Sequence, residues 1–148
     1  MNILKITTTT LATCLTSVGI IVGNSPLARA DYQSFKLAPD FLPDPAIGTG
    51  ESGGDRWVED CGYVDLADSP DHVLTLTSNF NYLKAQVYSS GDVTLLIDGP
   101  LGRICVDNPD ASLAPAFEDA WPAGTYHLWI GDFGKSFYQY QLFFTESK

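Results

Sequence analysis

Short segments in which apolar and polar residues alternate constrain the fold of this chain more than any other feature. Turn residues, such as Ser89 to Asp92, separate one segment from the next. Alternation with a period of two residues, broken by turns roughly every 8–12 residues, is typical of a β-sandwich or barrel. We therefore predict an all-β fold, a single antiparallel β-sandwich. The segments are His72 to Thr77, Tyr82 to Tyr88, Val93 to Asp98, Arg103 to Val106, Thr125 to Gly131 and Tyr138 to Thr145.

The segment from Asp31 to Arg56 is rich in proline and glycine. Proline lacks a backbone N–H and fixes φ, which excludes central strands and helix interiors. Only residues 35–37 look like a strand, so we predict an extended N-terminal segment that wraps the core; the alternative is a disordered terminus. Ala111 to Ala120 contains Pro115 and has no continuous apolar stripe, so no helix is expected there. The expected anchors of the extended segment are Phe35, Leu37, Phe41 and Leu42.

Residues 1–30 have the pattern of a secretory signal peptide. They contain no acidic residue, Lys5 precedes a mostly apolar run from Leu11 to Gly23, and Ala28-Arg29-Ala30 provides small residues at the cleavage positions. We expect cleavage before Asp31, which leaves residues 31–148 as one sandwich domain. A membrane anchor needs a longer apolar run, about 20 residues. A lipoprotein with Cys14 as the modified residue is the other alternative, but Thr13 is bulkier than such a site accepts.

The charge of the chain excludes one large class of partners. It has 8 basic and 18 acidic residues, a net charge of −10, and removal of the signal peptide with its two basic residues makes the charge −12. Binding to nucleic acid depends on lysine and arginine that displace counterions from phosphate. We expect no nucleic-acid partner and no stable membrane insertion after cleavage. With 45% hydrophobic residues, the chain is also too apolar for a disordered acidic tail.

Cysteine usage predicts one disulfide. Of three cysteines, Cys14 lies in the signal peptide, which leaves Cys61 and Cys105. An even pair in an oxidising compartment indicates a disulfide, and closing a loop of this length stabilises the fold by about 4 kcal/mol in the chain-entropy model. A zinc site is the weaker alternative, because no histidine accompanies the two thiols.

The run from Gly50 to Asp55 (GESGGD) is similar to the GDSGG motif around the nucleophile of chymotrypsin-like serine proteases. In those enzymes the glycines form an oxyanion hole beside an activated serine. The family needs a histidine before the serine, whereas His72 and His127 both follow Ser52 here. We interpret Ser52 as part of a turn and predict that the protein is not an enzyme.

Acidic and amide side chains follow the segment that holds the second cysteine. Asp107, Asn108 and Asp110 offer hard oxygen ligands on a loop, the chemistry that calcium prefers. These three residues are the candidate calcium site, and calcium is the only candidate cofactor. The alternative is that they are ordinary solvated carboxylates, which are common on protein surfaces.

Aromatic and amide residues alternate in the last two predicted strands. If these strands pair, Trp129 and Phe143 share a face with Gln139 and Gln141, and His127 lies beside Trp129. A surface of rings and amides stacks on sugars or binds a protein partner, so Trp129, His127 and Phe143 are the candidate ligand-binding residues. The alternative is that the N-terminal segment covers Trp129, because large rings are mostly buried.

The order of turn and strand motifs resembles small secreted bacterial β-sandwich proteins related to pre-peptidase C-terminal domains. The resemblance spans Phe35 to Glu146 and implies a jelly-roll-like sandwich that assists secreted enzymes and is usually not catalytic. Relatives often have two or three aspartates after the second cysteine, a cation site, of which only Asp107 is matched here, with Asn108 as a weaker donor. The motifs are Pro43-Asp44-Pro45, Ser52-Gly53-Gly54, Cys61-Gly62-Tyr63, Pro70-Asp71-His72, Gly91 to Ile97, Gly99 to Arg103, Cys105, Pro122 to Tyr126, Trp129 to Gly131 and Thr145-Glu146.

Together these observations predict an exported, non-catalytic accessory or binding module, located in the periplasm or outside the cell. Its expected partner is an envelope protein or a glycan. Two alternatives remain at this point. One is a small secreted serine hydrolase that uses the Gly50 to Asp55 segment, and the other is a purely structural envelope protein.

Overall fold

The computed structural model describes residues 33–66, 69–108, 110 and 114–148. The predicted signal peptide, its cleavage site and Cys14 lie outside the described residues. The described part of the chain contains no helix of the length and apolarity needed to cross a membrane. Its regular elements are all strands: β1 (Gln33–Leu37), β2 (Ala46–Glu51), β3 (Arg56–Val58), β4 (Gly62–Val64), β5 (His72–Leu76), β6 (Phe80–Ser89), β7 (Val93–Gly99), β8 (Gly102–Val106), β9 (Ala116–Trp121), β10 (Gly124–Asp132) and β11 (Gln139–Thr145).

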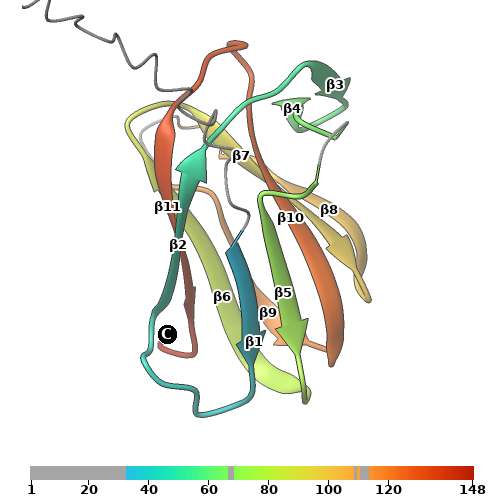
Figure 1. Ribbon diagram of the computed structural model, residues 1–148, viewed down its shortest axis with the longest axis vertical. Helices are drawn as coiled ribbons and strands as arrows, with labels where there is room; N and C mark the ends of the chain where they lie inside the picture. The colour runs from blue at the N-terminus through green and yellow to red at the C-terminus, as the bar shows by residue number, and fades with distance from the viewer. Residues whose placement is uncertain (1–32, 67–68, 109, 111–113) are drawn as a thin grey trace, which may run out of the picture.

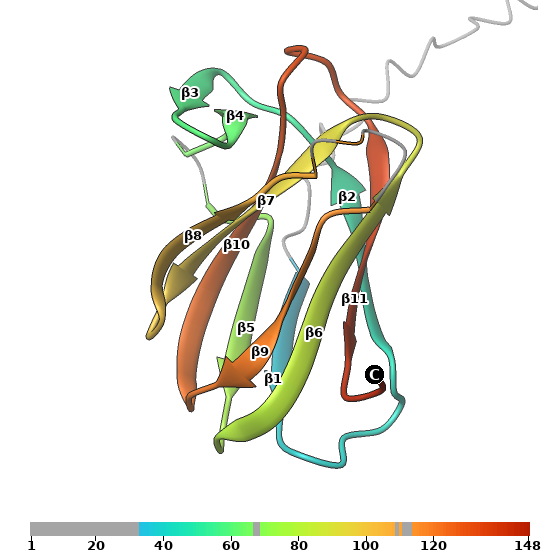
Figure 2. The same cartoon turned by 180° about the vertical axis from the view of Figure 1, so that it is seen from behind.

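The strands form two sheets that face each other, as Figures 1 and 2 show. Sheet A has seven strands in the order β1-β5-β10-β4-β3, with β7 beside β10 and β8 beside β7; sheet B has four strands in the order β2-β11-β6-β9. The predicted all-β sandwich is therefore confirmed. One detail differs from a purely antiparallel fold, because β1 runs parallel to β5. The chain crosses to sheet B after β1, so β1 is not joined to β5 by a hairpin.

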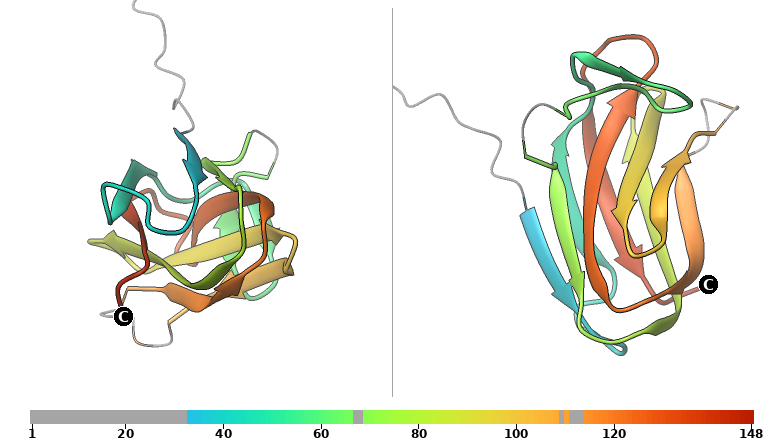
Figure 3. Two further views of the ribbon diagram at one scale, coloured as in Figure 1. Left: turned by 90° about the horizontal axis from the view of Figure 1, so that it is seen from below. Right: turned by 90° about the vertical axis from the view of Figure 1, so that its right-hand side faces the viewer.

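The main core lies between the two sheets and follows the predicted alternation. On β6 the inward residues are Leu83, Ala85 and Val87, and all three are fully buried. The end view in Figure 3 shows the two layers on either side of this core. The other large side chains of the core include Leu74, Leu76, Leu95, Ile97, Trp121, Tyr126, Leu128, Ile130, Leu142 and Phe144.

The N-terminal segment contributes more regular structure than its composition predicted. Phe35, Leu37 and Phe41 contact the main core as expected. Leu42 does not, because it is 90% exposed between β1 and β2, so its assignment as an anchor was wrong. Strand β2 was also missed. It pairs with β11 along one edge of sheet B, where long-range pairing overrides the low strand preference of its glycines.

The segment that was expected not to be helical forms a further edge strand. β9 pairs with β6, and its last residue, Trp121, is fully buried. The indole Nε1–H of Trp121 donates a hydrogen bond of 2.9 Å to the carbonyl of Leu83. This bond satisfies the polar atom of a large ring inside the core, which a buried tryptophan needs.

A polar bridge between the sheets crosses the main core. Tyr140 on β11 and His72 on β5 are both buried, and the phenol oxygen lies 2.9 Å from Nε2 of the imidazole. Burial lowers the pKa of His72 to about 4, against a smaller opposing effect of the Gln33 backbone. Burial, and secondarily the charge of Asp71, raises the pKa of Tyr140 well above its usual value. A protonated phenol and a neutral imidazole therefore share this hydrogen bond.

Close approach of β2 to this bridge requires glycine. A Cβ at Gly48 would lie 2.8 Å from Cε1 of His72, and one at Gly50 would overlap the phenol of Tyr140. The glycines that weakened the sequence signal for β2 are therefore the residues that let it close over the His72–Tyr140 pair.

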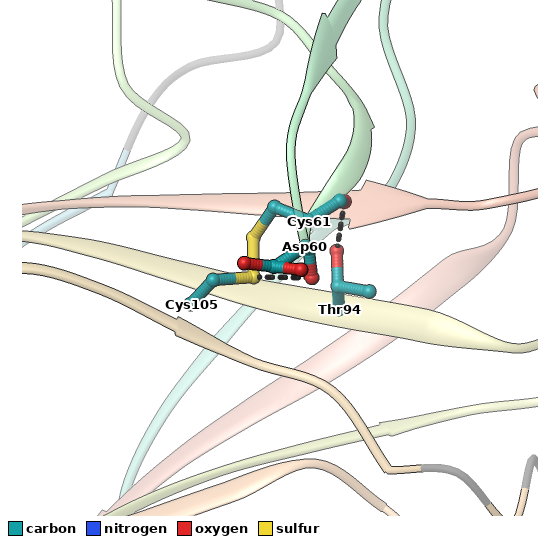
Figure 4. Close-up of a disulfide and its surroundings, with 4 residues drawn as sticks. All are labelled: Asp60, Cys61, Thr94 and Cys105. Atoms are coloured by element: carbon teal, nitrogen blue, oxygen red, sulfur yellow. Dashed lines mark hydrogen bonds between the residues drawn. A yellow bond between two sulfur atoms is a disulfide. The ribbon is translucent and has the colours of Figure 1, made fainter.

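The disulfide joins the β3–β4 hairpin to sheet A. Cys61 precedes β4 and Cys105 lies on β8, and their sulfur atoms are bonded, as Figure 4 shows. The hydroxyl of Thr94 donates a hydrogen bond of 2.7 Å to the carbonyl of Cys61. The predicted disulfide is confirmed.

The hairpin encloses a second, smaller hydrophobic cluster. Trp129, Leu96 and Cys105 occupy one row across the neighbouring strands β10, β7 and β8. The inward neighbours of this row belong to the main core, so the row points to the outer face of sheet A. The side chains that cover it come from the hairpin and the segment after it, namely Val58, Cys61, Val64 and Leu66.

Candidate functional site

Ser52, in the protease-like motif, holds strands together. It is buried, and its backbone N–H donates to the carbonyl of Tyr138 at 2.8 Å. Its Oγ accepts a hydrogen bond of 3.1 Å from the backbone N–H of Tyr138. Among the described residues no histidine bonds to this hydroxyl, since His72 bonds to Tyr140 and His127 contacts Trp129. The environment of Ser52 is that of a structural residue beside β11.

The candidate calcium ligands lie on the segment that follows β8. Asp107 and Asp110 are exposed, and Oδ1 of Asn108 accepts a hydrogen bond of 3.4 Å from the backbone of Asp110. No group of three or more histidine, cysteine or acidic side chains in the described ranges is placed to hold a metal ion. Burial and the charges of Asp107 and Asp132 raise the pKa of Asp92. Calcium binding by Asp107, Asn108 and Asp110 stays a prediction.

The three candidate ligand-binding residues do not form one surface. Trp129 and His127 lie on β10 in sheet A, whereas Phe143 lies on β11 in sheet B. Trp129 is only 9% exposed beneath the β3–β4 hairpin, while His127 is exposed beside it with ring centroids 6.1 Å apart. The last two strands do not pair, so the condition under which these residues would share a face is not met. The alternative that Trp129 is covered is correct, but the hairpin covers it and the N-terminal segment does not.

The pairing of β6 with β11 places a second aromatic residue, Tyr88, beside Phe143. In sheet B, Phe143 is opposite Ile47 of β2 and Gln86 of β6, and the next row holds Thr49, Gln141 and Tyr88. We call these outward rows, together with Pro45, Lys84 and Thr145, the open face.

The rings on the open face are accessible to solvent. Tyr88 is 51% exposed and Ile47 is 47% exposed, and Phe143 is half-buried between them. The rings of Tyr88 and Phe143 meet edge to face, with centroids 5.3 Å apart and planes at 87°. Such a pair is a favoured aromatic arrangement that leaves part of each ring uncovered.

A hollow lies over these side chains. It has a volume of about 430 Å³ and is lined by Pro45, Lys84, Gln86, Tyr88, Phe143 and Thr145. A second hollow, of about 320 Å³, shares Tyr88 with the first and extends over Ser89, Gln139, Tyr140 and Gln141. Because both border Tyr88, the two hollows form neighbouring parts of a shallow surface along β6 and β11.

Polar groups beside the rings retain capacity for hydrogen bonding. The Tyr88 hydroxyl donates to Oε1 of Gln86 at 3.0 Å, which leaves the amide N–H groups of Gln86 for another acceptor. Gln141 is exposed, and Lys84 forms no ion pair with any described residue. Glu118, opposite Lys84 on β9, instead accepts a hydrogen bond from Tyr82 that raises the pKa of that phenol.

Half of this surface was predictable from the sequence. Phe143 and its neighbouring glutamines were identified, and the alternation of residues 82–88 puts Lys84 and Gln86 on the outward side, but Tyr88 was missed. The signal was present, since Lys84, Gln86 and Tyr88 are spaced two apart and therefore share one face of a strand. What the sequence lacked was the pairing of β6 with β11.

The open face offers groups for stacking and for hydrogen bonding. Its rings present apolar surfaces, and its amides and ammonium group provide donors around them. The lining of the larger hollow contains no carboxylate, histidine, serine or cysteine.

Comparison with known proteins identifies relatives at two levels. A scan against models of protein families finds no match. An uncharacterized protein of Synechococcus elongatus is 36% identical over 120 residues, which cover 78% of this chain and 83% of the relative. Among solved structures, a pre-peptidase C-terminal domain of a collagenase from Bacillus anthracis has a TM-score of 0.48 and 10% identity, covering 76% of this chain and 94% of that domain.

A second solved structure is the periplasmic inhibitor of g-type lysozyme, PliG, from Aeromonas hydrophila. It has a TM-score of 0.44 and 12% identity, and the similarity covers 76% of this chain and 96% of the inhibitor. The collagenase domain belongs to the group of domains that the sequence motifs resemble.

Proposed function

This chain belongs to the same family as the Synechococcus elongatus protein, and we propose that it is an exported, non-catalytic binding module. Its binding surface is the open face of sheet B. The periplasm or the extracellular space is its place of action, and its partner is a component of the cell envelope or of the surrounding matrix.

The observation that carries this proposal is the pair of Tyr88 and Phe143, which lines a hollow beside the amides of Gln86 and the exposed Gln141. Exposed neighbouring aromatic residues cost solubility and are unusual unless they serve recognition. The corresponding outward row of sheet A, which contains Trp129, is covered by its own hairpin. The fold therefore covers one outer face and leaves the other available to a ligand.

Two observations support export. The disulfide between Cys61 and Cys105 is formed, and such bonds persist mainly in oxidising compartments. The pattern of residues 1–30 is the second. If export is correct, N-terminal sequencing of the protein recovered from the periplasm or medium gives a chain that begins at Asp31. A chain that keeps Met1, or a lipidated Cys14, contradicts this processing.

Binding is tested by co-sedimentation of the purified protein with the envelope fraction of the producing organism. We expect the unmodified protein to sediment and the Tyr88→Ala variant to remain in solution. Trp57→Ala is the matched control, because Trp57 is 58% exposed but lies on the β3–β4 hairpin, away from the open face. Equal sedimentation of both variants contradicts the proposed surface, and no sedimentation of any form contradicts the proposed function.

A further inference from the structure

We propose that the ligand of the open face is an uncharged saccharide chain that lies along β6 and β11. This inference rests on the proposed function and specifies its ligand. Three properties of the open face support it: the arrangement of apolar and polar side chains, the charge of the face and the shape of the two hollows.

Apolar and polar side chains are interspersed on the open face. Along β11 the outward order is Gln139, Gln141, Phe143, Thr145, and across the strands Phe143 lies between Ile47 and Gln86. A sugar ring has an apolar face of C–H groups and a rim of hydroxyls. A sugar ring stacked on Phe143 or Tyr88 therefore places its hydroxyls next to the amides of Gln86 and Gln141, which lie in the same rows.

The hydrogen-bonding state of the polar groups agrees with a hydroxyl-rich ligand. The amide oxygen of Gln86 accepts a hydrogen bond from Tyr88, so its N–H groups remain able to donate to an acceptor such as a sugar oxygen. Hydroxyl groups both donate and accept, so they satisfy the remaining amide of Gln141 as well. The centre of a protein interface, by contrast, is depleted of such scattered polar groups and needs a larger apolar area.

The charge of the open face favours an uncharged chain over an acidic one. Lys84 is the cation in the lining of the larger hollow. Two carboxylates share the same outward side of sheet B, because Glu51 is opposite Gln139 and Glu118 is opposite Lys84. The charge of Lys84 is thus offset, and the chain as a whole has a net charge of −10. A polyanion gains nothing from such a surface.

The shape of the surface favours a chain of several rings over a single small molecule. A site for a single small molecule is a concave cavity that encloses most of the ligand. The two hollows here, of about 430 and 320 Å³, lie side by side and border the same tyrosine. An extended ligand contacts both hollows and places successive units on either side of Tyr88.

The test is affinity electrophoresis of the purified protein in native gels that contain dextran, laminarin, xyloglucan or galactomannan. We expect at least one of these neutral polysaccharides to retard the protein, and polygalacturonate at the same concentration to retard it less. The Tyr88→Ala variant is expected to bind about tenfold more weakly, because it loses the ring on which a sugar stacks. Gln141→Leu, a second exposed position, is expected to weaken binding several-fold, and Trp57→Ala leaves it unchanged.

A parallel treatment of the envelope fraction separates failure of this inference from failure of the proposed function. Periodate destroys sugars with vicinal hydroxyls, and protease digestion destroys protein partners. Sedimentation that depends on Tyr88, survives protease and is lost after periodate supports the saccharide ligand. Sedimentation that depends on Tyr88 but survives periodate and is lost after protease overturns the saccharide ligand and leaves the binding module. Stronger retardation by polygalacturonate than by every neutral chain also overturns it.

Discussion

The outer faces of the two sheets have similar side chains, but one face is covered and the other is exposed to solvent. Sheet A presents a row with Trp129 and Leu96, and sheet B presents a row with Ile47 and Phe143. The row on sheet A is buried under the β3–β4 hairpin, whereas the row on sheet B is open to solvent. The difference arises from a single element, the hairpin that the disulfide attaches to β8.

An outward aromatic residue is therefore not by itself evidence for a binding site. Trp129 and Phe143 occupy equivalent outward positions on strands with the same alternation. One contributes to a second hydrophobic cluster, and the other lies in an open hollow. Whether an outward ring serves stability or recognition depends on what covers it.

Of the changes proposed here, removal of the disulfide is expected to have the largest effect on the cover over the outer face of sheet A. We expect Cys61→Ala combined with Cys105→Ala to lower the free energy of unfolding by about 4 kcal/mol, because the unfolded chain regains the entropy of the open loop. Urea titration followed by tryptophan fluorescence measures this loss. In the folded variant, increased quenching of Trp129 by iodide indicates a loosened hairpin. A loss below about 1 kcal/mol shows that the hairpin is held by its apolar contacts alone.

Truncation of the covered ring tests the energetic role of the second cluster. We expect Trp129→Ala to destabilise the fold by about 3 kcal/mol or more, because it removes a large buried ring and leaves a cavity. Trp129→Phe is the matched control and is expected to cost less, since it keeps a ring and removes a buried indole N–H that has no partner among the described residues. Equal losses in the two variants contradict a packing role. Chemical denaturation of both proteins provides the measurement.

The pH dependence of stability tests two buried titratable side chains, Asp71 and His72. Burial is the main reason that the pKa of His72 is lowered to about 4 and that of Asp71 is raised to about 6. As pH falls from about 6.5 to 4, the unfolded chain protonates His72 first, which destabilises the fold. As pH falls from about 6 to 3.8, the folded chain protonates Asp71 first, which stabilises it. The two effects are each about 3 kcal/mol and of opposite sign.

We therefore expect this pair to contribute little net change in stability between pH 6 and pH 4. Asp71→Asn removes the stabilising effect and keeps an oxygen to accept the hydrogen bond of 2.7 Å from the Ile130 backbone. The variant should lose about 3 kcal/mol more than the unmodified protein over this range. Urea unfolding at several pH values measures how stability changes with pH, with the exposed Asp55→Asn as the control. The same pH dependence in Asp71→Asn and in the unmodified protein means that burial does not raise the pKa of Asp71.

Truncation on the open face is expected to have the smallest effect on stability. Phe143→Ala removes a half-buried ring whose main contact is the edge-to-face pair with Tyr88. We expect a loss of about 1 kcal/mol or less, as for a cross-strand aromatic pair on a solvated face. A loss as large as that of Trp129→Ala shows that the two outer faces are energetically alike. Thermal and urea unfolding of the two alanine variants, measured together, decide this.

Much of the fold was predictable because its information is local. The alternation in β6, β10 and β11 correctly separated inward from outward residues, and the disulfide followed from the count of cysteines. The strands β2 and β9 were not predictable in this way. Glycine and proline obscured their pattern, and both form at edges of sheet B through pairing with distant strands.

The candidate site shows the same division. Phe143 and Gln141 were identified from their own strand, and the alternation of residues 82–88 puts Lys84 and Gln86 on the outward side of theirs. Their convergence with Tyr88 depends on the contact between β6 and β11, which are separated in the sequence by β7 to β10. Trp129 was grouped with Phe143 because successive strands often pair, which is not so here.

The sequence by itself determined which side chains of each strand share a face, because neighbouring residues in an extended chain point in opposite directions. It also determined the chemistry of the disulfide and the acidic charge of the chain. Only the tertiary structure decided which outer face is covered and which is open. The reason is physical: the cover on Trp129 is a hairpin from elsewhere in the chain, and its position depends on long-range packing and one covalent bond.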